Sequence, residues 1–191
     1  MPSPAPDTAR IRTGYTAADV RFVQGMIAHH GQALVMTALV PSRAASDAVK
    51  LLAERIDASQ KTEIVTMQRW LRGRGERVPE PGDMSAMHHA MGHDMGAMPG
   101  MAGMSADTST TGLMPGMLTA TQLSQLAAAT GADFDRLFLE DMIRHHEGAI
   151  RMVAELFAAP GAGQEPQLFD MANGIEADQR AEIARMRAML P

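Results

Sequence analysis

The sequence predicts an all-α protein, a four-helix bundle made from two copies of one helical hairpin. One reason is composition: 46% of the 191 residues are hydrophobic but only 4% are aromatic, so a core must be aliphatic. Helices suit such a composition better than a β-sandwich, because strands favour β-branched and aromatic residues. The other two reasons are an internal repeat and an apolar stripe with helical periodicity.

The two halves of the chain repeat one another. Residues 19–36 and 135–152 are identical at eight of eighteen positions, and residues 53–71 and 172–190 at eight of nineteen. The second alignment has an offset three residues larger than the first. The three extra residues fall in the connection between the two helices, where changes in loop length are tolerated. Each repeat is a pair of helices that cannot bury its apolar stripe alone, so we expect both pairs to pack together with approximate two-fold symmetry.

The first helix follows a polar, proline-rich tail. It begins at the capping-box-like sequence from Thr16 to Asp19 and is predicted to end at Pro41. On a helical wheel, its apolar residues lie within an arc of roughly 180°. They are Phe22, Val23, Met26, Ile27, Ala33, Leu34, Met36, Thr37 and Val40. The opposite face carries Gln24, Ala28, Gly31 and Gln32.

The later helices are predicted from caps, from the repeat and from glycine or proline stops. They cover residues 46–72, a short stretch at 119–129, and residues 132–158 and 167–190. Between the halves, residues 79–117 have no apolar periodicity and indicate a flexible linker. The predicted segments are a disordered tail (1–14), a first hairpin (15–78), the linker (79–117) and a second hairpin (118–191).

Both halves carry the pattern Met-x-x-His-His on the apolar stripe of a helix. His30 and His146 fall near the centre of the stripe, while His29 and His145 fall at its edge. A buried imidazole needs a partner. The second helix of each hairpin offers such partners as second-shell groups: Gln60, Glu63, Gln179 and Glu182. Imidazole together with thioether suits copper(I), whereas calcium and magnesium prefer oxygen.

These patterns define a first set of candidate metal ligands in the bundle. The set is Met26, His29, His30, Met36, Met67, Met142, His145, His146, Met152 and Met186. A structural interpretation stays open, in which His–Glu and His–Gln hydrogen bonds hold the bundle and methionine fills the core. A di-iron site of the ferritin type is not expected, because the chain contains no Glu-x-x-His sequence.

The linker is itself a candidate metal-binding segment. Residues 84–104 hold seven methionines, three or four positions apart, and three histidines. Thioethers at this spacing suit copper(I) or silver(I), and histidines add capacity for copper(II). An ordinary linker would consist of serine, glycine, proline and charged residues, because exposed methionine is easily oxidised. The candidate ligands are Met84, Met87, His88, His89, Met91, His93, Met95, Met98, Met101 and Met104.

The paired Met-x-x-His-His-x-x-Ala-x-x-Met helices, each followed by Gln-x-x-Glu-Ile-x-x-Met, resemble the bacterial DUF305 family over residues 15–72 and 119–190. The resemblance implies a ferritin-like four-helix bundle, export from the cytoplasm and copper binding, as in the family's characterised members. It assigns candidate ligand roles to the methionines and histidines of the two matching helices. The chain departs from a strict repeat where Met189 stands in the place of Trp70, and its Met/His-rich insert is richer than the resemblance requires.

We therefore expect a periplasmic or secreted, non-enzymatic protein that binds copper(I) or silver(I) for sequestration, tolerance or delivery. We expect that a signal peptide was removed, because none is visible at the start of the sequence. The net charge of −5 without a basic run argues against nucleic acid as a partner. Another copper-handling protein is an expected partner. The alternatives are a metal-dependent oxidase and a helical interaction module that binds no metal.

Overall fold

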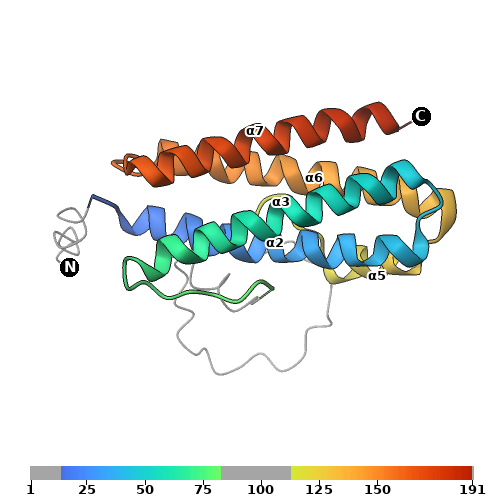
Figure 1. The fold of residues 1–191 in the computed structure, drawn as a ribbon, viewed down its shortest axis with the longest axis horizontal. Helices are drawn as coiled ribbons and strands as arrows, with labels where there is room; N and C mark the ends of the chain where they lie inside the picture. The colour runs from blue at the N-terminus through green and yellow to red at the C-terminus, as the bar shows by residue number, and fades with distance from the viewer. Residues whose placement is uncertain (1–13, 83–112, 191) are drawn as a thin grey trace, which may run out of the picture.

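The protein folds into a helical bundle in the computed structural model, which describes residues 14–82 and 113–190 (Figure 1). These residues form four long helices, one short helix and no strand. The helices are α2 (Ala17–Arg43), α3 (Asp47–Arg72), α5 (Ala120–Ala128), α6 (Gly131–Ala158) and α7 (Pro166–Met189). The all-α class and the helical bundle predicted from the sequence are confirmed. None of the helices in the described ranges is long and apolar enough to cross a membrane.

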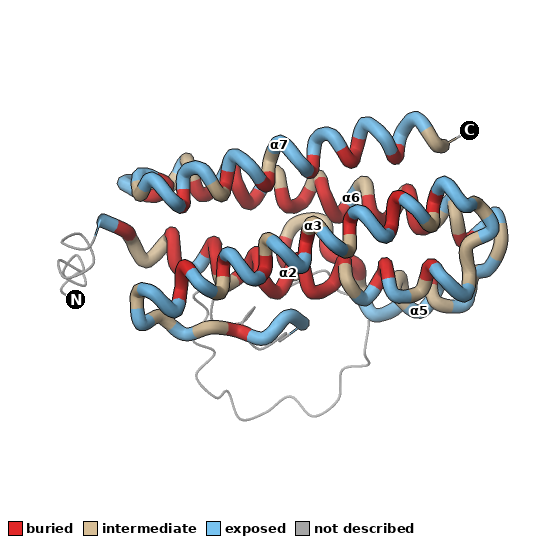
Figure 2. Tube along the Cα trace, in the orientation of Figure 1, coloured by how far each residue is buried: buried red, intermediate tan, exposed pale blue. Residues whose placement is uncertain are grey.

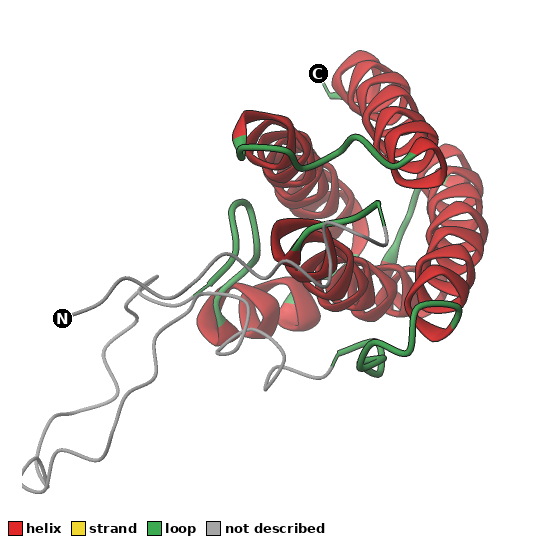
Figure 3. Ribbon diagram, turned by 90° about the vertical axis from the view of Figure 1, so that its left-hand side faces the viewer, coloured by secondary structure: helices red, strands yellow, loops and turns green. Residues whose placement is uncertain are grey.

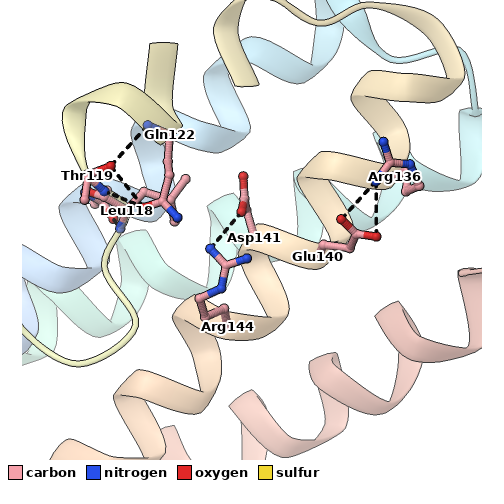
Figure 4. Close-up of polar contacts among 8 residues, drawn as sticks. Leu118, Thr119, Gln122, Arg136, Glu140, Asp141 and Arg144 are labelled. Atoms are coloured by element: carbon pink, nitrogen blue, oxygen red, sulfur yellow. Dashed lines mark hydrogen bonds and ion pairs between the residues drawn. The ribbon is translucent and has the colours of Figure 1, made fainter. Parts of the chain in front are cut away.

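Side-chain caps fix the starts of the described helices except α6. The Thr16 hydroxyl accepts from the Asp19 amide at 3.2 Å, and the Asp19 carboxylate accepts from the Thr16 amide at 2.6 Å. Asp19 is fully buried and also accepts from the Gly163 amide at 2.7 Å, which ties the start of α2 to the connection between α6 and α7. Thr119 and Gln122 form the same reciprocal box at the start of α5 (Figure 4).

The first helix ends two residues later than predicted. Pro41 lies inside α2, which continues to Arg43. The proline removes only one N–H donor in the last turn, and the Ala44 amide still donates to the Val40 carbonyl at 3.0 Å. The Pro41 side chain is exposed.

Helices α2 and α6 form the centre of the bundle. Helix α3 packs against α2, α7 packs against α6, and α2 contacts α6 directly. The view roughly along the bundle shows the long helices packed side by side (Figure 3). The two hairpins are therefore joined mainly through the α2–α6 interface, where the repeated histidine pairs lie.

Helix α2 is buried on more than its apolar stripe. Ala28, Gly31 and Gln32, predicted to face away from the core, are buried. The segments that flank the undescribed residues 83–112 cover them: a Cβ on Gly31 would collide with the backbone of Gly82, and Gln32 bonds to Leu118. The apolar stripe therefore located the core correctly but gave no sign of this additional cover.

The buried residues lie along the inward faces of the long helices (Figure 2), and the apolar ones among them form two clusters along the bundle. In α2 the first cluster takes residues 20–28 and the second takes residues 33–40. In α6 the order is reversed, as it must be for neighbouring antiparallel helices. The gap between the clusters on every long helix is where the polar side chains predicted as a site are found.

Candidate metal centre

A layer of eight polar side chains separates the two apolar clusters at the middle of the bundle. Each long helix contributes two of them, at equivalent positions of the two repeats. This polar layer consists of His29 and His30 on α2, Gln60 and Glu63 on α3, His145 and His146 on α6, and Gln179 and Glu182 on α7. All are buried except Glu63, whose side chain is 15% exposed. The structure thus brings together four predicted ligands and four predicted second-shell groups.

Each hairpin holds its own His–Glu pair within the layer. His30 Nε2 donates to Glu63 Oε2 at 2.5 Å, and His146 Nε2 donates to Glu182 Oε2 at 2.6 Å. The donor and acceptor are 33 residues apart in the first pair and 36 apart in the second, which reflects the three-residue offset between the repeats. A ring nitrogen held in this way by a carboxylate leaves the opposite nitrogen, Nδ1, as the atom available to a further partner.

His29 and His145 connect the two hairpins. Their ring centroids are 3.9 Å apart across the α2–α6 interface. His29 Nε2 lies 3.0 Å from the carbonyl oxygen of Pro115. Because a carbonyl only accepts, this nitrogen carries the proton and His29 Nδ1 carries the lone pair. Neither ring nitrogen of His145 has a hydrogen-bonding partner of good geometry among the described residues.

The layer contains many buried polar atoms without a partner in the described part of the chain. They are Nδ1 of His29, His30 and His146, both ring nitrogens of His145, both side-chain polar atoms of Gln60, and Oε1 of Gln179. Unpartnered polar atoms are rare in protein interiors, because each costs about 1–3 kcal/mol. Their concentration in one layer indicates that it takes up something more, either water or an ion.

The two interfacial histidines are held in their neutral form. Burial, reinforced by the neighbouring His30, lowers the pKa of His29 to about 3, while the Pro115 carbonyl opposes the shift. Burial also lowers the pKa of His145 well below its ordinary value, and the nearby histidines act in the same direction, with only the His29 backbone opposing. A neutral imidazole has a lone pair, which is the form that binds metal ions.

The predicted methionine ligands of the bundle are all buried, but in two groups. Met26, Met67 and Met152 belong to the apolar cluster on one side of the polar layer, and Met36, Met142 and Met186 belong to the cluster on the other side. Methionine side chains therefore lie in both apolar clusters, on the two sides of the polar layer along the bundle axis. The predicted linker ligands between residues 84 and 104 lie outside the described residues.

Within the described residues, no three His, Asp or Glu side chains converge closely enough to hold a metal ion together. The observed arrangement does not provide the compact three- or four-ligand site that zinc requires. It offers imidazoles in pairs with thioethers beside them. The donor set fits a soft ion that accepts two or three ligands, which is the behaviour of copper(I) and silver(I).

Sequence reasoning missed the segment from residue 113 to residue 118. Its Pro115 carbonyl sets the tautomer of His29, and Leu118 exchanges two hydrogen bonds with the Gln32 amide, at 3.0 and 2.7 Å. The sequence did contain a signal for this contact, namely glycines inside two helices. Glycine weakens a helix, so a glycine in a helix interior indicates that another part of the backbone approaches closely there. A Cβ on Gly148 would collide with the Pro115 carbonyl, and Gly31 is restricted in the same way by Gly82.

The comparisons with known proteins agree with this architecture. The DUF305 family, described as a domain of unknown function, matches residues 19–190. A DUF305 fragment from Deinococcus radiodurans superposes with a TM-score of 0.69 at 28% identity, covering 92% of this chain and 96% of the other. A DUF305 protein from Streptomyces coelicolor, expected to be secreted, gives 0.65 at 25% identity, with coverages of 90% and 91%. No curated protein matches the chain.

One structural relative carries metal ions. CopM in its Cu(II)-bound form superposes with a TM-score of 0.63 at 28% identity, covering 90% of this chain and 94% of the other. CopM has also been solved in Cu(I)-bound and Ag-bound forms. The family match spans nearly the whole chain, and the relatives share its helical architecture. The chain belongs to the DUF305 family.

Proposed function

We propose that this protein binds a soft monovalent metal ion, copper(I) or silver(I), in the polar layer of its bundle. The observation that carries the proposal is that His29, His30 and His146 each have Nε2 tied to an oxygen while Nδ1 is buried with no partner among the described residues. Histidines that bind metals usually donate their second ring nitrogen to a carboxylate or a carbonyl in this way. The metal-bound forms of CopM support the choice of metal at low identity.

His29 Nδ1 and the ring nitrogens of His145 would supply the ligands between the hairpins, because these two rings are adjacent and neutral. His30 and His146 would each bind a separate ion or replace one of these ligands, since no three of the described His, Asp or Glu side chains converge on one point. Glu63 and Glu182 would orient those rings and offset the charge of the ion. Thioethers from the bordering methionines would complete the coordination, since soft sulfur ligands select copper(I).

An ion has a route to the layer between α3 and α7. A groove of about 690 Å³ runs between these helices, and Glu63 and Trp70 line it together with Asp178 on the opposite side. Glu63 is thus the member of the polar layer that meets solvent and also the partner of His30. The groove carries the carboxylates of Glu63, Asp170 and Asp178 against the guanidinium groups of Arg69 and Arg74, a small excess of negative charge.

The biological role that follows is sequestration, tolerance or delivery of copper outside the cytoplasm. Methionine and histidine bind copper(I) without thiols, and the chain has no cysteine. The linker methionines would add capacity to the sites in the bundle. We propose a binding protein rather than an enzyme, since the sequence shows no nucleophile with an adjacent base.

The test is an anaerobic copper(I) titration against a chromophoric chelator. Three chains are compared: the full chain, a chain lacking residues 84–112, and a chain with the replacements His30→Leu, Glu63→Leu, His146→Leu and Glu182→Leu. Removing both partners of each pair avoids leaving a buried charge alone. A control replaces the three linker histidines, His88, His89 and His93, by alanine.

The proposal expects the deleted chain to retain tight copper(I) binding and the layer variant to lose the sites that the deleted chain retains. The linker-histidine control is expected to keep those sites. If the deleted chain binds no copper(I), the polar layer is structural and metal binding belongs to the linker. If the full chain binds none, the protein is better explained as a helical interaction module.

A further inference from the structure

A cavity on the outer face of the α2–α6 interface is lined by two methionines: Met114, which has no part in the proposed bundle site, and Met152, whose side chain also faces this cavity. The cavity has a volume of about 300 Å³ and is open to solvent. Its walls include Phe22, Gly25, Met114, Pro115, Met152 and Leu156, and the charged side chains of Arg21 and Glu155 also line it. The site is separate from the groove between α3 and α7.

The two thioether side chains meet over Gly25. A Cβ placed on this glycine would lie 3.2 Å from Met114 Sδ and 3.5 Å from the methyl carbon of Met152. The repeat does not demand a glycine here, because the equivalent residue of the second half is Asp141. Glycine inside a helix costs roughly 0.5–1 kcal/mol relative to alanine. What the glycine provides is the space in which both sulfur-bearing side chains reach one point.

Met114 is held in place by a turn with several anchors. The Met117 amide donates to the Met114 carbonyl at 3.2 Å, and Gly116 has a φ of 78°, as position three of a type II turn requires. Gly148 on α6 lets the backbone of Pro115 and Gly116 approach closely. The His29 ring bonds to the Pro115 carbonyl, so the polar layer and the cavity lie on either side of one residue.

We propose that Met114 and Met152 form a thioether site for a soft monovalent ion at the surface of the bundle. Thioether sulfur selects such ions, and it is a weak ligand for hard cations. Both side chains are mostly buried, at 6% and 8% exposure, yet they line a cavity that solvent enters. Two methionines that line one solvent-open cavity can bring their sulfurs to an ion by rotating their side chains, without unfolding of the helices. Pro115 then separates the bound ion from the His29 ring.

The identity of the ion in this inference rests on the proposed function, whereas the position of the site does not. The alternative is that Met114 and Met152 only fill space, as buried methionines commonly do. Methyl NMR distinguishes the two explanations. The full chain is labelled with [¹³C-methyl]methionine, silver(I) is added as an air-stable probe, and the two signals are assigned from Met114→Leu and Met152→Leu variants.

The proposal expects the Met114 and Met152 methyl signals to shift together as silver(I) is added. Each leucine variant should abolish the silver-induced shift of the remaining methionine. Met117→Leu is the matched control, since Met117 is buried in the same turn but does not line the cavity, and it should leave both shifts unchanged. Gly25→Leu should fill the cavity and abolish both shifts while keeping both sulfurs.

Two unshifted signals, or a shift of one signal alone, would overturn the inference. Failure of the bundle site is measured separately, from the imidazole signals of the four layer histidines in a parallel titration of the chain labelled with [¹³C]histidine. Unshifted imidazoles with shifted Met114 and Met152 methyls would refute the proposed site in the layer and leave this one standing. Shifted imidazoles with unshifted methyls would do the reverse.

Discussion

His29 of α2 and His145 of α6 lie against each other at the centre of the bundle, with ring centroids 3.9 Å apart and an interplanar angle of 39°. The two residues occupy equivalent positions of the internal repeat, one in each hairpin. Two protonated imidazoles at this separation would repel strongly in a buried environment. The packing of the two hairpins therefore depends on both rings remaining neutral.

The metal-free protein should lose stability as the pH falls below about 6.5. The folded state lowers the pKa of His29 to about 3 and that of His145 well below its ordinary value, so the unfolded chain binds protons that the folded chain does not. Each such proton costs about 1.4 kcal/mol of unfolding free energy per pH unit over that window. Urea unfolding at pH 7.5, 6.5 and 5.5 measures the slope.

A control for this pH dependence replaces both rings, in the double variant His29→Asn, His145→Asn. Its unfolding free energy should vary less between pH 7.5 and 5.5 than that of the original chain. The carboxyl groups of Asp141 and Asp178 have raised pKa values, chiefly because of burial, and they act with the opposite sign at lower pH. An equal slope in both proteins would show that the interfacial pair is not the origin of the effect.

Removing one partner of a His–Glu pair should cost more than removing both. Glu182→Leu leaves the buried His146 Nε2–H without an acceptor, which should lower the unfolding free energy by about 1–3 kcal/mol. Adding His146→Leu should restore part of the loss, because two apolar groups pack against each other. Urea unfolding at pH 7.5 compares the single variants, the double variant and the original chain.

The first repeat supplies an internal comparison. Glu63 is 15% exposed and lines the groove, whereas Glu182 is 8% exposed. Water can replace the lost carboxylate more easily at His30, so Glu63→Leu should be less destabilising than Glu182→Leu. A larger effect at Glu63 would contradict the assignment of solvent access to the α3–α7 side.

Silver(I) should raise the thermal stability of the folded chain if the layer binds it. Binding to the folded state alone adds about 2.7 kcal/mol at a free concentration one hundred times the dissociation constant. The variant with leucine at His30, Glu63, His146 and Glu182 should show a much smaller rise at the same concentration. The unfolding temperature is measured by differential scanning calorimetry for the original chain and for this variant. Both proteins lack residues 84–112, so that the linker methionines make no contribution. Equal rises in both chains would place the ion outside the layer.

Gly148→Ala should detach the segment that contains Pro115. The added Cβ would collide with the Pro115 carbonyl, and strain of this kind typically costs 1–3 kcal/mol. Amide hydrogen exchange at Leu118 should become faster, because its bond to Gln32 depends on the same segment. The matched control is Gly174→Ala, where a Cβ meets nothing within 4 Å. That change should stabilise α7 by about 0.4–1 kcal/mol.

The sequence predicted the helices well because their signals are local. The caps at Thr16 and Thr119, the stops at Gly73 and Pro160, and the repeat located the ends of the helices to within a few residues. The clustering of the four histidines followed from the duplication, since equivalent helices of two similar hairpins meet at equivalent positions. Pro41 was misjudged because the last turn of a helix loses little when one donor is missing.

The cover of α2 could not be derived in the same way. The turn at residues 114–117 has no apolar periodicity, and its position depends on contacts with residues far away in the chain. Gly31 and Gly148 marked the places of close approach but not the partner. The pairing of His29 with the Pro115 carbonyl, which determines the free nitrogen of the ring, therefore required the three-dimensional structure.

The polar layer also determines how far each helix lies along its neighbours. The apolar clusters on both sides consist mostly of aliphatic and methionine side chains, with a few aromatic ones, so by themselves they specify only weakly against a slide of one turn, about 5.4 Å. Such a slip would place His146 or His30 against leucine or isoleucine and leave a carboxylate buried alone. The layer therefore fixes the axial register of all the long helices. Each hairpin carries its own His–Glu pair, so a single hairpin holds half of the contacts that set this register. Two identical hairpins would meet in the same register as the two unlike halves of this chain.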